Sequence, residues 1–399
     1  MTRRAVIVDV VRSPFTRGRE GSTLSPLHPV DLYAGVLDAL LKRSGVEPAR
    51  VEDVIAGCVA QVGEQAANIA RHAILAAGFP ETVPGVSLDR KCGSAQQAVD
   101  FAAQGVIAGA YDVVIAGGVE MMSRVNMRVN RMGRDEHGPR LRKRYPDGLV
   151  RQGISAELIA ARWGISREAM DAYSLESHRR AAQAEDAGIT ARDIVAVEVP
   201  GESGDTITVE NDEGIRRDTS AERLAALRPA FEDARMAARF PEIRWSVTAG
   251  NSSQISDGAA AALVMEESVA ERLGLEPRAR VTHFSVIGDD PLYMLTGPIP
   301  ATERLLQRAG LSIDDIDRFE VNEAFASVVL AWQKSLGVEG ERINVFGGAI
   351  SLGHPVGASG GRLLANLLSA LEISKGRYGV QVMCESGGMA NATLVERLC

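Results

Sequence analysis

Cys92 stands at a junction that suits a reactive thiol. The apolar stretch Val86-Ser87-Leu88 comes shortly before it, and helix-forming residues begin directly after Gly93. A thiol at this point has the geometry of a nucleophile elbow, and the exposed N–H groups of the helix favour a thiolate by about 0.3–1 kcal/mol. Because a free cysteine has a pKa of about 8.5, the helix end alone is not enough to ionise most of this thiol at neutral pH. A small residue packed at a tight turn is the structural alternative.

Further help is expected from a histidine, and His354 lies in an unusual segment. Six glycines accompany it between Asn344 and Gly361. Glycines at this density let the backbone approach a ligand closely and adopt positive φ. A phosphate-binding loop is the competing interpretation, but the P-loop lysine and the dinucleotide-binding spacing are both missing. His354 is therefore the candidate partner of Cys92.

Two more polar sites follow apolar stretches. Cys384 comes after Val380-Gln381-Val382-Met383 and shortly before Gly387-Gly388. Asn322 and Glu323 come where a predicted buried strand meets the next element. Buried polar groups need hydrogen-bond partners or a functional role, so we consider these residues candidates for the active site.

The elements that must position these residues look duplicated. Residues 40–57 and 305–322 each read as a helix, a glycine stop and a strand. Downstream, residues 92–118 and 354–388 each read as a glycine-bearing turn, a helix of small residues and a strand that ends near paired glycines. Strands alternating with helices favour an α/β fold, here two similar sheets packed through shared helices, with the candidate turns facing each other.

An insertion interrupts this scheme. We expect an N-terminal half formed by residues 1–120 plus about 254–275, an inserted loop domain over 121–253, and a C-terminal half over 276–399. The insertion is rich in arginine between Arg124 and Arg151, then helical from Ser155 to Ala187. For the arginine-rich part a solvated loop, attraction of a phosphate-bearing ligand and a subunit contact all stay open.

Bulk properties exclude several classes of protein. A chain of 399 residues with 45% hydrophobic content can bury a large core, and its net charge of −8 argues against a general nucleic-acid binder. The N-terminal apolar run is short and broken by Asp9, and no long apolar segment suits a membrane span, so we expect a cytoplasmic protein. Four cysteines lack the spacing of a disulfide framework or a metal site, and Cys58 and Cys399 are interpreted as structural.

Taken together, five segments resemble the signatures of the thiolase family, in the family's order. They are Cys92-Gly93-Ser94, the stretch from Gly250-Asn251-Ser252-Ser253 to Asp257-Gly258-Ala259-Ala260, Asn322-Glu323-Ala324-Phe325, Gly348 to Gly360 around His354, and Cys384 with Gly387-Gly388. The resemblance covers nearly the whole chain. It implies a thiolase-like duplicated architecture of five layers, α-β-α-β-α, with an inserted loop domain.

The resemblance also implies a role for each matching residue. Cys92 would accept the acyl group after activation by His354, and Cys384 would act as acid and base. Asn322 would hold a water that stabilises an enolate together with His354. The backbone N–H of Cys92 and one from the Ser386 region would form a second oxyanion hole, with Gly387 and Glu323 as support.

Coenzyme A is the implied co-substrate, with no permanently bound cofactor and no metal. The residues implied to bind CoA or substrate are Arg216, Ser253, Met294, Phe325 and Gln152, and Arg217 could replace Arg216. The chain departs from the best-known biosynthetic members at Ser386, at Gln254, at Arg151-Gln152 and in an extra stretch between Phe231 and Trp245. These differences leave specificity for acetoacetyl-CoA in doubt.

We therefore expect thiolytic cleavage of 3-ketoacyl-CoA to acetyl-CoA and a shortened acyl-CoA, in the degradation of fatty acids or of steroid or branched side chains. Similarity to actinobacterial degradative thiolases favours this choice. A biosynthetic acetoacetyl-CoA thiolase is the first alternative, and an inactive acyl-CoA-binding scaffold is an alternative from another class. Ketoacyl synthases share the duplication but lack a second cysteine equivalent to Cys384. The family resemblance suggests a homodimer or homotetramer.

Overall fold

The computed structural model describes residues 3–201 and 203–398, so Cys399 lies outside the described residues. The N-terminal half supplies the following elements in chain order: β1 (Ala5–Arg12), β2 (Thr16–Arg17), α1 (Pro29–Ser44), β3 (Asp53–Gly57), α2 (Ile69–Ala76), β4 (Gly85–Leu88), α3 (Ser94–Ala108), β5 (Val113–Met121), and, after the insertion, β8 (Ser256–Glu266) and α9 (Glu267–Arg272). The C-terminal half supplies β9 (Ala279–Gly288), α10 (Pro298–Ala309), β10 (Arg318–Val321), α11 (Ala326–Leu336), α12 (Ala349–Leu352), α13 (Ser359–Ser374), β11 (Tyr378–Glu385) and β12 (Met389–Arg397).

The strand pairings confirm the expected duplication. In the first half β3 pairs parallel with β5, β5 pairs antiparallel with β8, and β8 pairs antiparallel with β1. In the second half β10, β11, β12 and β9 repeat this series with the same directions. The two sheets are also joined at one edge, where Val6 pairs with Arg280 and Ile7 with Ala279, so they form one continuous ten-stranded sheet.

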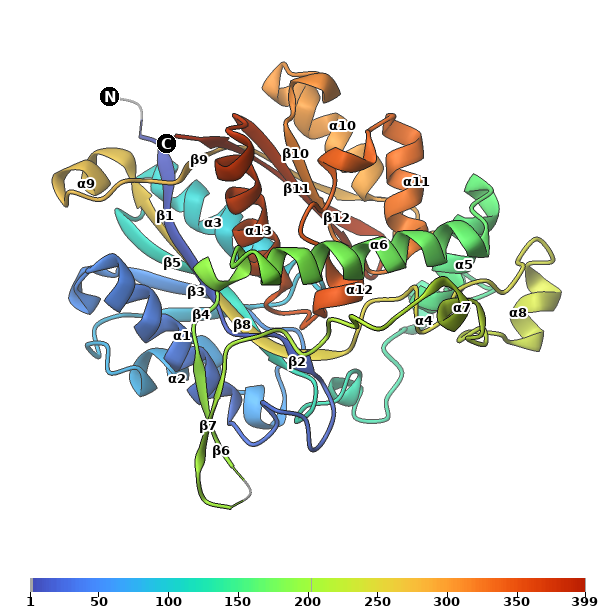
Figure 1. Cartoon of the computed structure of the whole chain (residues 1–399), viewed down its shortest axis with the longest axis horizontal. Coiled ribbons are helices and arrows are strands. Elements are labelled where there is room, and N and C mark those ends of the chain that lie inside the picture. The colour runs from blue at the N-terminus through green and yellow to red at the C-terminus, as the bar shows by residue number, and fades with distance from the viewer. Residues whose placement is uncertain (1–2, 202, 399) are drawn as a thin grey trace.

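Five layers follow from how the helices cover the two sheets. The helices α1 and α2 pack on the outer face of the first sheet, and α10 and α11 pack on the outer face of the second (Figure 1). The central layer is the pair α3 and α13, whose apolar faces share one core cluster with strands of both sheets. The prediction of a duplicated α-β-α-β-α architecture is therefore confirmed.

Local sequence explains where the paired helices begin and end. Pro29 and Pro298 start α1 and α10, where a missing N–H costs nothing. Gly45 and Gly310 end the same two helices at φ of 69° and 67°, a left-handed conformation that residues with a Cβ rarely adopt. The predicted glycine stops are confirmed in both copies.

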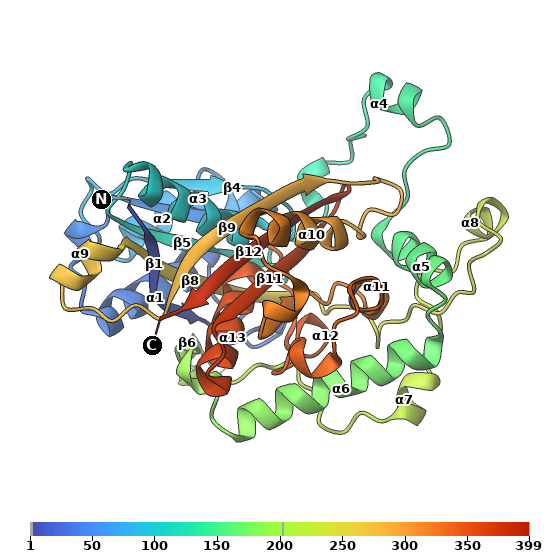
Figure 2. The same cartoon turned by 90° about the horizontal axis from the view of Figure 1, so that it is seen from above.

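The segment between β5 and β8 contains helices and one hairpin. They are α4 (Pro139–Arg144), α5 (Gln152–Trp163), α6 (Arg167–Asp186), the hairpin of β6 (Val197–Pro200) and β7 (Thr206–Val209), α7 (Ala221–Ala225) and α8 (Ala234–Arg239). The helical stretch predicted from Ser155 to Ala187 is present as α5 and α6, interrupted at Gly164. The helix α4 stands away from the body of the molecule at the end of long loops (Figure 2). Several elements are joined by single-turn 3-10 helices. These are η1 (Pro48–Arg50), η2 (Gly63–Gln65), η3 (Val129–Arg131), η4 (Thr190–Arg192), η5 (Ile313–Asp315) and η6 (Gly340–Arg342).

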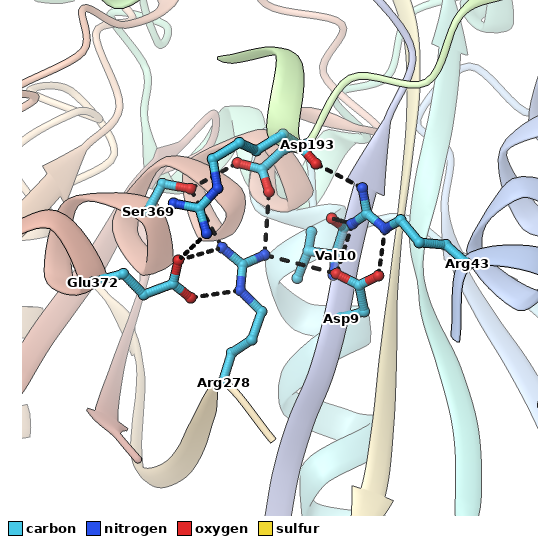
Figure 3. Close-up of polar contacts among 8 residues, drawn as sticks. Asp9, Val10, Arg43, Asp193, Arg278, Ser369 and Glu372 are labelled. Carbon is cyan, nitrogen blue, oxygen red and sulfur yellow. Dashed lines mark hydrogen bonds and ion pairs between the residues drawn. The ribbon is translucent and has the colours of Figure 1, made fainter. Parts of the chain in front are cut away.

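A cluster of ion pairs fastens the middle of the insertion, just after η4, to both halves (Figure 3). Arg278, just before β9, pairs with Glu372 of α13 at 2.7 Å and with Asp193, which follows η4, at 3.1 Å. Arg43 of α1 pairs with Asp9 of β1 at 2.5 Å. The cluster lines an open cavity of about 840 Å³ at the C-terminal end of α13. Because its main charges are paired with one another, we interpret it as a structural clamp, which we call the Arg278 cluster.

None of the helices in the described ranges is both long and apolar enough to cross a membrane. Cys58 is fully buried in the core between the first sheet and helices α1 and α2.

Candidate active site

The turn between β4 and α3 carries Cys92. Lys91 adopts a left-handed φ of 52°, and Gly93 immediately precedes the first residue of α3. Cys92 is 5% exposed and packs with Leu363 and Met383. The sequence prediction of a cysteine between a strand and the start of a helix is confirmed.

The resting form of Cys92 is the thiol. Burial raises its pKa to about 12, Glu385 adds to the increase, and an N–H group of Ser386 lowers it. A rise from about 9 to about 12 corresponds to about 4 kcal/mol. The end of a helix supplies about 0.3–1 kcal/mol, so α3 alone does not ionise this thiol. A base must take the proton when substrate is bound.

Cys384 lies close enough to Cys92 for their charges to interact, although the two are far apart in sequence. It stands near the end of β11 and is 1% exposed. Burial raises the pKa of its thiol, and Cys92 and Glu385 raise it further, whereas a hydrogen bond with the side chain of Asn322 lowers it. The structure therefore brings two protonated thiols into one buried site.

His354 is held in one tautomer by its neighbours. Its Nδ1 lies 2.6 Å from Ser359 Oγ, and that hydroxyl donates to the carbonyl of Pro355 at 2.8 Å. Because the hydroxyl proton is already committed, Ser359 Oγ accepts from Nδ1–H, which leaves the lone pair on Nε2. Burial lowers the pKa of His354 to about 3, and the charge of Arg362 lowers it as well. A neutral imidazole whose Nε2 carries no proton can accept one.

The backbone of His354 is fixed by the segment before β8. Its N–H lies 3.0 Å from the carbonyl oxygen of Gln254 and 3.1 Å from Ser256 Oγ. The amide of Gln254 donates to the carbonyls of Gly214 and Ile350 at 2.9 and 2.8 Å. Gln254, a departure from the family pattern, therefore ties the insertion, β8 and the loop of His354 together.

Asn322 and Glu323 lie in the site but face different partners. Asn322 Nδ2 is 3.4 Å from His354 Nε2. Glu323 accepts hydrogen bonds from Tyr173 Oη and Ser177 Oγ at 2.8 Å each and from the N–H of Ile350 at 3.1 Å. Glu323 therefore holds the glycine-rich loop against α6, while Asn322 faces the imidazole.

The turn after β11 bends away through two glycines. Gly387 and Gly388 have φ of 95° and 78°, both in the region that favours glycine. Ser386 is half-buried, and a hydrogen bond from its backbone lowers the pKa of the Cys92 thiol. This backbone N–H is the kind of donor that an oxyanion hole needs.

An apolar wall borders Cys384. Met294 and Phe325 belong to the same buried cluster as this thiol. Phe231 packs edge-on against Phe325, with ring centroids 5.9 Å apart. Ser253 lies beside this wall, because its N–H bonds to the carbonyl of Ala324 at 3.0 Å. The structure therefore gathers Ser253, Met294 and Phe325 on the side of Cys384.

Arg216 and Gln152 are less buried than the residues around the two thiols. Arg216 is exposed, and its backbone N–H donates to Nδ1 of buried His178 at 3.1 Å. Within residues 3–201 and 203–398 its guanidinium forms no ion pair. The neighbouring Arg217 pairs with Glu185 and Asp186, so it is less available for a ligand. Gln152 is half-buried at the start of α5.

Sequence reasoning missed four residues of this site. Ser359 orients His354, Arg362 acts on the pKa of His354, His178 holds Arg216, and Glu385 raises the pKa of both thiols. A serine five residues after His354 at the start of a predicted helix was a usable signal for Ser359. The other three carried no local signal, because their effect depends on burial beside residues distant in sequence.

Comparisons with known proteins agree with this geometry. The family model described as thiolase, N-terminal domain matches residues 5–268, and that described as thiolase, C-terminal domain matches residues 275–397. The steroid 3-ketoacyl-CoA thiolase FadA6 of Mycobacterium tuberculosis is 46% identical over 99% of this chain and 94% of its own length. A 3-ketoacyl-CoA thiolase of Pseudoalteromonas translucida is 42% identical over 98% of both chains. The crystal structure of the Bacillus anthracis acetyl-CoA acetyltransferase superposes with a TM-score of 0.88 at 37% identity, covering 100% of this chain and 99% of that one.

Proposed function

Because the chain belongs to the thiolase family of acyltransferases, we propose that it cleaves 3-ketoacyl-CoA with a second molecule of CoA, giving acetyl-CoA and a shortened acyl-CoA. The reaction is a reversible Claisen condensation that we expect to run in the degradative direction. The observation that carries the proposal is the meeting of two buried thiols and a neutral imidazole around one site.

In the first half-reaction His354 Nε2 takes the proton of Cys92. The thiolate attacks the 3-keto carbon of the substrate, and the bond between carbons 2 and 3 breaks. The departing electron pair forms the enolate of acetyl-CoA, which Cys384 protonates. Acetyl-CoA leaves, the shortened acyl group stays on Cys92, and Cys384 is left as a thiolate beside protonated His354.

In the second half-reaction Cys384 takes the proton of the incoming CoA thiol. The CoA thiolate attacks the acyl thioester on Cys92 and releases the shortened acyl-CoA. The Cys92 sulfur recovers its proton from His354, so protons and electrons balance over the cycle. A raised pKa suits Cys384 to deprotonate CoA in this half-reaction, because the conjugate base of a weaker acid is a stronger base.

Two oxyanion sites follow from the same arrangement. Asn322, through a water, and protonated His354 stabilise the enolate oxygen, and the N–H groups of Cys92 and Ser386 stabilise the tetrahedral intermediate. Gly387 allows the turn that aims the Ser386 N–H, and Glu323 holds the His354 loop in place.

For substrate binding we propose an acyl site along Met294 and Phe325 and a CoA site along Ser253, Gln152 and Arg216. The exposed guanidinium of Arg216 suits a CoA phosphate. A steroid-derived or branched acyl group is the favoured substrate class, supported by the relative that is named a steroid 3-ketoacyl-CoA thiolase. A biosynthetic acetoacetyl-CoA thiolase is the second candidate, favoured by the similarity to an acetyl-CoA acetyltransferase structure. An inactive scaffold is disfavoured because Cys92, His354 and Cys384 are all present.

A kinetic panel tests this function. We expect kcat/KM to be higher for bulky 3-ketoacyl-CoA substrates than for acetoacetyl-CoA. Cys92→Ala is expected to abolish acyl-enzyme formation, whereas Cys384→Ala is expected to accept an acetyl group from acetyl-CoA and fail in condensation. Strong preference for acetoacetyl-CoA would favour the biosynthetic alternative, and wild-type turnover of Cys384→Ala would remove this residue from the mechanism.

We also propose that residues 121–253 form the inserted loop domain.

For the assembly we propose a homodimer or homotetramer. The support for an oligomer is exposed apolar surface at two places. Val86 on the edge strand β4 and Phe101 on α3 are each 43% exposed, and Met132 near α4 is 79% exposed. Edge strands and apolar patches of this kind are normally covered. Light scattering measures the mass directly, and a stable monomer would contradict the proposal.

A further inference from the structure

Glu385 is a buried carboxyl group pressed against the Cys92 turn. It is the last residue of β11, directly after Cys384, and its side chain is fully buried. A Cβ atom added to Gly93 would lie 2.0 Å from Glu385 Oε1, so the carboxyl group fills the space beneath the turn. Among the residues that the structure describes, neither carboxyl oxygen finds a hydrogen-bond partner. A buried carboxyl without partners is costly and calls for a function.

The groups around Glu385 oppose its ionisation. Burial raises the pKa of Glu385 to about 8. Arg90, in the turn after β4, lowers it, whereas Asp100 of α3 and Asp89 raise it further. On the other side, Glu385 raises the pKa of both Cys92 and Cys384. At neutral pH the carboxyl group is therefore mainly protonated, and it becomes an anion beside Cys92 only at alkaline pH.

We infer that Glu385 is a positioning residue whose protonated form allows Cys92 to become a thiolate and whose ionised form opposes it. Two features carry this inference. The carboxyl group occupies the same end of α3 as the Cys92 sulfur, so an anion on Glu385 competes for the same partial positive charge. Because no hydrogen bond compensates the ionised Glu385 carboxylate, its charge repels the Cys92 thiolate, and the low dielectric constant of the interior strengthens this repulsion.

The inference deepens the proposed function, because it rests on Cys92 as the reacting thiol. It assigns to Glu385 no contact with the substrate. It predicts a protein that responds to pH through a carboxylic acid rather than through His354, whose pKa lies far below neutrality.

Alkylation of Cys92 by iodoacetamide tests the inference without any acyl-CoA. The rate is followed from pH 6 to 10 by mass spectrometry of the peptide that contains Cys92. In the wild-type protein we expect the rate to rise with pH and to flatten above about pH 8, as Glu385 ionises. In Glu385→Gln the flattening is expected to disappear, so that the variant reacts about tenfold faster at pH 9.5 and within about twofold of wild type at pH 6.5.

Two further variants keep the test independent of folding defects. Asp100→Asn removes a charge that raises the pKa of Glu385, so it is expected to move the flattening to lower pH while Glu385 is still present. Glu157→Gln alters another buried carboxyl, on α5, which does not act on Cys92, and it is expected to keep the wild-type profile. Thermal unfolding of each variant checks that it is folded.

The outcomes separate this inference from the proposed function. A wild-type profile in both Glu385→Gln and Asp100→Asn would overturn the role of Glu385. Failure of acetyl-CoA to acetylate Cys92, with the Glu385-dependent flattening intact, would instead refute the thiolase chemistry and leave the effect of Glu385 on this thiol standing.

Discussion

At the scale of single residues, the site keeps its reactive groups neutral until substrate arrives. Burial raises the pKa of the Cys92 and Cys384 thiols and lowers that of His354. A preformed thiolate–imidazolium pair would be costly in this buried space. The direction of the first proton transfer therefore depends on His354 presenting Nε2 as its basic nitrogen, and that depends on Ser359.

Ser359→Ala removes the acceptor that holds His354 Nδ1–H. Since loss of the group that holds the tautomer of a catalytic imidazole can lower kcat by up to about 10⁴-fold, we expect kcat/KM for 3-ketoacyl-CoA to fall at least about tenfold while KM changes little. Ser374→Ala is the matched control, because Ser374 lies on the same helix and also donates to a carbonyl four residues earlier. Equal kinetics for the two variants would show that Ser359 does not orient the imidazole.

At the scale of elements, the two ends of α13 have different roles. Ion pairs at its C-terminal end hold separate segments together, and the proposed catalytic residues lie near its N-terminal end. His354 and Ser359 lie at the N-terminal end of this helix, and Glu372 lies in its last turn. Arg278 bridges Glu372 and buried Asp193, and Ser369 Oγ donates to Asp193 at 2.8 Å. The Arg278 cluster therefore sets how the insertion and β9 meet the helix that carries the active site.

Arg278→Met would leave Asp193 and Glu372 without their shared cation. Removing one partner of a buried ion pair usually costs about 3–5 kcal/mol, and we expect the lower part of this range because Arg278 is 13% exposed. The midpoint of urea unfolding measures the loss. Arg142→Met, at a pair with 66% exposure of the arginine, is expected to change the midpoint only slightly. A midpoint for Arg278→Met as high as that of Arg142→Met would contradict the structural role of the cluster.

At the scale of the whole molecule, protonation of buried groups links stability to pH. Burial raises the pKa of Asp100 to about 7 and of Glu385 to about 8, well above the values of unfolded carboxyl groups. The folded state therefore binds more protons than the unfolded state, and this contribution is lost as pH rises through the folded pKa. His178 and His354 have lowered pKa values, so they reduce stability only below about pH 6.5.

Between pH 6.5 and 8.5 buried carboxyl groups dominate, and we expect Asp100 and Glu385 together to lower the free energy of unfolding by about 3 kcal/mol over this range. Urea unfolding at the two pH values measures the change. A variant with both Asp100→Asn and Glu385→Gln is expected to show a flatter dependence, since neither position titrates. If the double variant keeps the wild-type slope, these two carboxyl groups do not govern the effect.

The local features and the kind of chemistry could be predicted from the amino-acid sequence. Apolar stretches, prolines at helix starts and glycines such as Gly45 and Gly310 act on their own neighbours, so the duplicated order of elements was readable from one chain. The residue types at Cys92, His354 and Cys384 were equally readable, because each lies in a segment with a distinctive glycine pattern.

How those residues behave depends on the folded molecule and could not be predicted from the segments alone. The tautomer of His354 depends on Ser359, and the continuous sheet depends on the short pairing of β1 with β9. The influence of Glu385 on Cys92 arises from segments nearly 300 residues apart. Exclusion of water and the distance between charges set these pKa values, and both are properties of the packed molecule, not of neighbours along the chain.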